Sequence, residues 1–207
     1  MSEQLPPTEP VPAPPEQPER HPVRLIVNDD LRRSRLTVLF RLLLVIPHII
    51  WLSLWGIVVF LAAIVAWFAT LFSGWCPAGL HNFIARYVRY SAHVNAYLYL
   101  IANPYPKFSG RPGYPIDLEV DSPERQNRWV TGFRIILGIP ALIVAGVLQQ
   151  VLQIIAFLGW FVCLAIGRMP KGMRDLSAYC LRYVMQTHAY LYLLTSRYPS
   201  FAGTPVD

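Results

Sequence analysis

The chain has 207 residues, of which 54% are hydrophobic and 14% are charged, and its mean hydropathy is +0.37. Soluble domains carry roughly 25% charged residues, so this composition argues against an ordinary soluble enzyme. The net charge of +6 is spread along the flanks of apolar segments instead of forming one patch, which argues against nucleic acid as a partner.

The first 21 residues are rich in Pro, Glu and Gln. Such a segment cannot bury enough apolar surface to offset the entropy lost on ordering. We therefore expect residues 1–21 to form a disordered, Pro-rich cytoplasmic tail.

From residue 22 onward the chain is a tandem repeat, because the sequence matches itself without gaps at a shift of about 93 residues. The first predicted membrane repeat covers residues 22–110 and the second covers residues 111–207. Each repeat begins with five residues of alternating pattern, Val23–Val27 and Ile116–Val120. Their β-branched content predicts short strands, and the strands of the two repeats could pair.

A long apolar block follows each strand, and no Lys, Arg, Asp or Glu lies between Arg41 and Arg86. A single helix over residues 36–72 would measure about 55 Å, whereas the hydrocarbon core of a bilayer is about 30 Å thick. We therefore predict two transmembrane spans joined by a tight turn in each repeat. The predicted spans are residues 36–54, 57–73, 129–148 and 151–167.

The predicted turns lie at Gly56 and at Gln149-Gln150, because Gln149 aligns with Gly56 in the repeat. A turn at the far headgroup level would let these glutamines reach water, whereas glutamines inside the bilayer would need partners on other helices. The alternative is that Gln149, Gln150 and Gln153 line a polar path through the membrane.

After each hairpin, a Pro-x-Gly segment at Pro77 or Pro170 precedes an amphipathic helical pattern. We expect this helix to lie along the cytoplasmic headgroups with its basic residues toward anionic lipid. Nearly all Lys and Arg residues fall on the side to which the hairpins return, so the positive-inside rule predicts that both termini are cytoplasmic. The two repeats should then be related by a pseudo-twofold axis along the membrane normal.

The predicted fold is therefore mainly α and integral to the membrane. It has four transmembrane helices arranged as two tandem hairpins, each preceded by a short strand and followed by an interfacial amphipathic helix.

Arg41 and Arg134 lie near the start of the first predicted span of each repeat, and Trp67 and Trp160 lie on the return spans. We hypothesise that each arginine stacks on the tryptophan of its own hairpin, within about 6 Å of the ring. The alternative is that all four residues are independent anchors at the membrane interface.

Pro47 and Pro140 fall inside the first predicted spans, where a missing amide is expected to kink the helix. The cysteines show no CxxC or histidine-linked spacing, so we expect no disulfide framework and no zinc site. No HExxH motif, paired intramembrane carboxylate or nucleophile elbow is present. We therefore expect no catalytic residue, cofactor or metal, although a membrane enzyme using His48 and His81 is a third class to test.

Both repeats carry the motifs FRxxLxIP, WFxxLxxGxxPxG, RYxxxxxAYLYL and YPxFxG. Together these motifs resemble the prokaryotic membrane family known as domain of unknown function 4389, in two tandem copies. The resemblance implies membrane residence and a repeated architecture, and it implies no particular reaction.

These observations predict a non-enzymatic, multi-pass protein of the bacterial plasma membrane, an accessory or scaffold component with a basic cytoplasmic face. Its expected partners are membrane lipids and either another membrane protein or further copies of itself, with no nucleic acid. The alternative is a transport or channel subunit for a lipid or a small solute.

Overall fold

The computed structural model describes residues 21–202, so the predicted tail, apart from His21, lies outside the described residues. Within this range the elements follow one another as β1 (Val23–Val27), α1 (Arg35–Leu39), α2 (Arg41–Ser73), α3 (Ala78–Leu98), β2 (Ile116–Val120), α4 (Arg128–Gly132), α5 (Arg134–Ile166) and α6 (Lys171–Leu191). The predicted mainly helical class is confirmed, as are both predicted strands.

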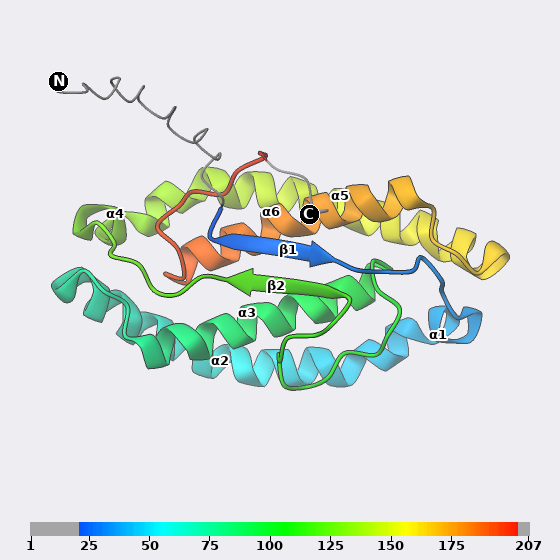
Figure 1. Ribbon diagram of the computed structural model, residues 1–207, viewed down its shortest axis with the longest axis horizontal. Helices are drawn as coiled ribbons and strands as arrows, with labels where there is room; N and C mark the ends of the chain where they lie inside the picture. The colour runs from blue at the N-terminus through cyan, green and yellow to red at the C-terminus, as the bar shows by residue number, and fades with distance from the viewer. Residues whose placement is uncertain (1–20, 203–207) are drawn as a thin grey trace, which may run out of the picture.

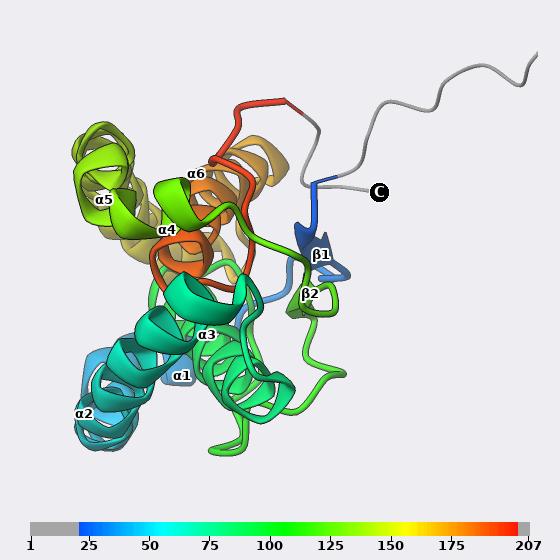
Figure 2. The same cartoon turned by 90° about the vertical axis from the view of Figure 1, so that its left-hand side faces the viewer.

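The elements form three layers whose helices and strands all run along the long axis of the molecule (Figure 1). The long helices α2 and α5 lie on one side, the two-stranded sheet lies on the opposite side, and α3 and α6 lie between them (Figure 2). Contacts of α3 with α2, α6 and β2, and of α6 with α5 and β1, hold these layers together.

The strands of the two repeats pair with each other, as their position in the sequence allowed. Strands β1 and β2 are antiparallel, with Val23 opposite Val120 and Val27 opposite Ile116. A ribbon of two strands is marginal in water, and this one is stabilised by packing against α3 and α6. Leu25 and Leu118 at its centre are buried in the main hydrophobic core.

The predicted hairpins inside the apolar blocks are wrong, because each block is one continuous helix of 33 residues. Gly56 and the Gln149-Gln150 pair are helical, so within residues 21–202 two helices are long and apolar enough to cross a membrane, not four. A glycine in a helix costs only about 1 kcal/mol relative to alanine, and glutamine is a good helix former. Neither residue type can therefore end a helix that its apolar neighbours and its packing favour.

The ends of the long helices explain part of the motif pattern. Each is preceded by a five-residue helix, α1 or α4, and Phe40 or Phe133 separates the short helix from the long one. Each ends at a glycine in the left-handed conformation, with φ of 80° at Gly74 and 75° at Gly167. Glycine adopts this conformation without steric cost, so the shared glycine of the two motifs is a helix C-cap.

The helix hairpin of each repeat is therefore formed by the long helix and the helix that follows it, α2 with α3 and α5 with α6. Both amphipathic helices are present, and they form the middle layer, where 10 of the 21 residues of α3 and 13 of the 21 residues of α6 are buried. Their position at a membrane interface stays a prediction.

The two repeats are intertwined at both ends of the molecule. The α1 helix packs on α5 and the α4 helix packs on α2. Arg32 forms a β-bridge with Arg168, and Trp75 forms the equivalent bridge with Arg125. The end of each long helix thus lies beside the start of the other, and α2 and α5 run antiparallel (Figure 1).

Candidate functional site

The most extensive functional feature is the exposed outer face of α2 and α5, which we call the apolar surface. In the most apolar stretch of each helix, only 11% of the residues of α2 and 22% of those of α5 are buried, so neither helix lies in the interior of the described fold. Beyond the first residue of each helix, Arg41 and Arg134, neither sequence contains a charged side chain. Water is a poor solvent for a continuous apolar face of this length, so the surface requires an apolar partner.

The face that each long helix turns toward the protein follows helical spacing. Val45, Val59 and Ala66 are buried in α2, and the equivalent positions of α5, Gly138, Leu152 and Gly159, are buried as well. This narrow stripe leaves most of the circumference of both helices free for the surroundings.

At the start of α2, Arg41 binds the end of α3. Its Nη1 donates to the carbonyls of Tyr97 at 2.7 Å and Ala102 at 3.3 Å, and its guanidinium lies 4.3 Å from the centre of the Tyr97 ring. The last carbonyls of a helix have no partner within the helix and carry partial negative charge, so a cation there is favourable. Arg41, which is 2% exposed, therefore links the start of α2 to the end of α3 in the interior of the hairpin.

Arg134 makes the same contacts in the second repeat. Its Nη1 donates to the carbonyls of Tyr190 at 2.6 Å and Thr195 at 3.1 Å, and its guanidinium lies 4.6 Å from the Tyr190 ring. Nearby, Glu124 accepts a hydrogen bond from the Ser196 amide at 2.7 Å. Burial would raise the pKa of Glu124, but bonds from Ser196 and Thr195 and the charge of Arg134 outweigh it, so this pKa lies below its usual value.

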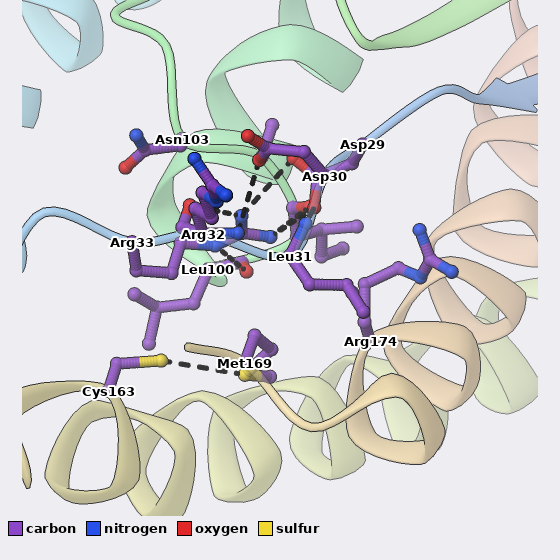
Figure 3. A network of polar contacts seen from close by, with 12 residues as sticks. Asp29, Asp30, Leu31, Arg32, Arg33, Leu100, Asn103, Cys163, Met169 and Arg174 are labelled. Carbon is purple, nitrogen blue, oxygen red and sulfur yellow. Dashed lines mark hydrogen bonds and ion pairs between the residues drawn. The ribbon is translucent and has the colours of Figure 1, made fainter. Parts of the chain in front are cut away.

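Beside Arg41, Arg33 forms a buried ion pair with Asp29 (Figure 3). Its Nη2 lies 2.6 Å from Asp29 Oδ2 and its Nη1 lies 3.2 Å from Oδ1. The remaining donors bind main-chain carbonyls, including Leu100 at 3.0 Å and Ile101 at 2.7 Å. All five N–H groups of this guanidinium thus have acceptors, as a buried arginine requires.

The two repeats differ at this position, because Gln126 stands where the first repeat has Arg33. Gln126 donates to the Leu193 carbonyl at 2.8 Å and accepts from Arg134 Nη2 at 2.7 Å. Arg33 is itself a cation and cannot accept, and Nη2 of Arg41 is buried without a protein acceptor. The first repeat therefore holds two buried arginines, of which Arg33 is paired with the Asp29 carboxylate.

The hypothesis that Arg41 stacks on Trp67, and Arg134 on Trp160, is wrong. Each pair lies at opposite ends of one continuous helix, about 39 Å apart at 1.5 Å per residue. Trp67 Nε1 instead donates to the Thr131 carbonyl in α4 at 2.8 Å, and Trp160 Nε1 donates to the Val38 carbonyl in α1 at 3.0 Å. Both tryptophans bind the opposite repeat.

The prolines and glutamines singled out from the sequence lie at different places along α2 and α5. Pro47 and Pro140 lie inside α2 and α5, one and a half turns or so from their starts, as predicted from the sequence. Gln149, half-buried near the middle of α5, donates to the hydroxyl of Tyr99 in the first repeat, while Gln150 and Gln153 are exposed. The glutamines therefore lie along a helix face and not at a turn.

A second polar cluster links α3 to β2. His93 Nε2 lies 2.9 Å from Asp117 Oδ1, and Asp117 also accepts from the Gly113 amide at 2.9 Å. Burial would raise the pKa of Asp117, but the bonds from His93 and from the amides of Gly113 and Leu118 outweigh it, so this pKa lies below its usual value. Among residues 21–202, no group of three or more His, Cys, Asp or Glu side chains could hold a metal ion.

An apolar groove of about 450 Å³ opens between α2 and α3 in the first repeat. Trp51, Trp55, Phe83 and Phe108 are among its lining residues. His48 stacks on Phe108, with 4.3 Å between the ring centres. The second repeat has smaller aliphatic residues, Val144, Leu148 and Leu176, at the first three of these positions.

Several residues of these contacts were not singled out from the sequence. Tyr97 and Tyr190 belong to the repeated AYLYL motif, so their repetition was a signal that they contact another repeated residue. Tyr99 could have been paired with Gln149 only from the fold, because the two belong to different repeats. Arg33 and Gln126 differ in type, and nothing in the sequence indicated that they bind equivalent carbonyls, those of Leu100 and Leu193.

Comparison with known protein families gives one match. The family described as Domain of unknown function (DUF4389) matches residues 35–110 and 128–203, which together make up more than half of the chain. Each match runs from the short helix before the long helix to the segment after the amphipathic helix. Neither the curated proteins nor the solved structures contain a match.

Proposed function

The chain belongs to the family described as Domain of unknown function (DUF4389), and because this description names no reaction, we propose a function from the structure. The protein is a non-enzymatic component of the bacterial plasma membrane that acts as an accessory or scaffold protein. The apolar surface of α2 and α5 contacts lipid, and the basic residues contact lipid headgroups, a partner membrane protein or a second copy.

The single observation that supports this proposal is the exposure of two helices of 33 residues that carry no charged side chain beyond their first residue. Leu43 and Ile57 are each 63% exposed and Phe72 is 72% exposed. Moving such a side chain from water into an apolar environment is favourable by about 2 kcal/mol. In this proposal both termini lie on the cytoplasmic side, where the positive-inside rule places the basic residues. A multi-pass arrangement would require α2 and α5 each to cross the bilayer once.

Flotation of the purified chain with vesicles of phosphatidylethanolamine and phosphatidylglycerol tests the proposal. We expect the chain to float with the vesicles and the variant Leu43→Lys/Ile57→Lys to float less. Glu119→Lys, on the exposed side of the sheet, is the matched control and should float as the parent does. A chain that stays in the aqueous fraction without detergent would disprove membrane residence. Purification from native membranes with lipids retained would then identify the partner.

The second candidate function is a transport or channel subunit for a lipid or small solute. It is favoured by Gln150 and Gln153, which are exposed on an otherwise apolar helix, next to Gln149. Solute flux through the protein in liposomes, abolished by Gln150→Leu/Gln153→Leu, would support this candidate. A copurifying partner without flux would support the scaffold.

A further inference from the structure

We propose that α2 and α5 lie parallel to the membrane plane within one leaflet, with α3, α6 and the sheet stacked on their cytoplasmic side. This orientation rests on the proposed membrane residence and goes beyond it, since it replaces crossing helices by helices that lie in the plane. The partner of the apolar surface is the acyl-chain region of a single lipid leaflet.

The layers of the molecule are the first reason. The α3 helix runs along α2, and β2 runs along α3, so these elements share the direction of the long helices (Figures 1 and 2). If α2 crossed the bilayer, the exposed Arg86 of α3 and the exposed ion pair of Arg24 with Glu119 would lie at hydrocarbon depth. The sheet would also expose its unpaired strand edges to lipid, which does not occur in membrane proteins.

The length of the helices is the second reason. A helix of 33 residues is about 50 Å long, so it would have to tilt by about 53° to keep its whole length within a hydrocarbon core of about 30 Å. Transmembrane helices tilt by about 0–40°. A helix that lies in the plane of the membrane has no such length limit.

The charge distribution is the third reason. Exposed arginines lie at both ends of the long helices, Arg32 and Arg35 near the end of α5, and Arg125 and Arg128 near the end of α2. Crossing helices would place one cluster on each side of the membrane, against the positive-inside rule. With the helices in the plane, both clusters face the same headgroup layer.

The glutamines of α5 fit the same orientation. Gln149 and Gln150 lie at the middle of Arg134–Ile166, so a crossing helix would hold the exposed Gln150 amide near the bilayer centre. Along a helix in the plane every position has a similar depth. The amide of Gln150 then remains within reach of the polar glycerol region.

The internal twofold symmetry is also consistent with long helices that lie in the membrane plane. In an antiparallel ribbon the local twofold axis is perpendicular to the sheet, and here it leads from the sheet between α3 and α6 toward the layer of α2 and α5 (Figure 2). With the helices in the plane this axis is the membrane normal. The two repeats then insert equally, and both ends of the described chain lie on one side.

The test measures depth along one helix. Leu43, Ile57 and Phe72 lie about four turns apart on the exposed face of α2. Each is replaced by cysteine in a chain whose Cys76, Cys163 and Cys180 are changed to alanine, spin-labelled, reconstituted in vesicles and measured for depth. We expect three similar, shallow depths, and a label at Glu119→Cys, the matched control, in water.

A label at Ile57→Cys near the bilayer centre, with the other two near opposite surfaces, would overturn the orientation and leave membrane residence intact. Failure of the chain to float with vesicles, or its recovery as a soluble dimer, would overturn both. Oriented circular dichroism of the unmodified protein in aligned bilayers is the second measurement, which needs no variant. We expect the spectrum of helices parallel to the plane, and the spectrum of helices along the normal would contradict the orientation.

Discussion

Leu25 of β1 pairs with Leu118 of β2, and the two leucines occupy the same position of the repeat. The register is therefore symmetric about this pair, with Val23 opposite Val120 just as Ile116 is opposite Val27. The pair lies on the internal twofold axis, which explains why the other contacts between the repeats come in matched couples. Each contact of one repeat can therefore be compared with its equivalent in the other repeat.

Arg41→Lys should destabilise the protein by about 3 kcal/mol. A lysine keeps the charge but cannot bind two carbonyls and stack on Tyr97 at once. Arg134→Lys should have a similar effect, and Arg128→Lys, at an exposed position, should have almost none. Thermal unfolding in detergent, followed by circular dichroism, measures these differences. Equal stability of all three variants would show that the arginines do not close the hairpins.

Arg33→Gln should cost about 3–5 kcal/mol, because it leaves the Asp29 carboxylate buried without a cation. The double variant Asp29→Ser/Arg33→Gln copies Ser122 and Gln126 of the second repeat, where no such pair exists. Its glutamine can accept from Arg41 Nη2, as Gln126 accepts from Arg134. We therefore expect the double variant to be more stable than Arg33→Gln alone. A double-mutant cycle on the unfolding free energy measures the coupling, and purely additive effects would contradict it.

Trp67→Phe and Trp160→Phe should each destabilise the protein by about 1 kcal/mol, since each removes one hydrogen bond to the opposite repeat and keeps an aromatic ring. Trp129→Phe is the control, because Trp129 is 78% exposed. Unfolding in detergent and hydrogen exchange of α1 and α4 are the measurements. Faster exchange of α1 and not of α4 in Trp67→Phe would be inconsistent with the intertwined contacts. The same holds for faster exchange of α4 and not of α1 in Trp160→Phe.

The stability of the protein should fall in acid partly through Asp117. Its pKa in the folded protein lies below the unfolded value of about 3.9, so its contribution is present above that pH and is lost as the pH falls through the folded pKa. Asp117→Asn should lower stability at pH 7 and flatten its dependence on pH below about 4. Asp121→Asn, which removes an exposed ion pair with Arg24, should change the profile much less. Unfolding free energies between pH 7 and pH 3 test this sign.

Much of the local structure followed from the sequence. The alternating β-branched pattern predicted both strands with the bounds that the structure has, and the Pro-x-Gly segments predicted the starts of α3 and α6. The repeat predicted that equivalent residues such as Arg41 and Arg134 would make equivalent contacts. The hairpin turns at Gly56 and Gln149 were wrong because they were placed from the thickness of a bilayer, whereas the residues at both positions are compatible with a continuous helix.

The sequence by itself determined the tandem repeat, the strands and the uncharged apolar blocks, because these depend on neighbours along the chain and on residue type. Only the tertiary structure decided that each block is one helix and that Trp67 and Trp160 bind the opposite repeat. Two nearly equivalent copies offer each side chain the same partner twice, once in its own repeat and once in the other. Packing over the whole molecule chooses between them, and no local pattern records that choice.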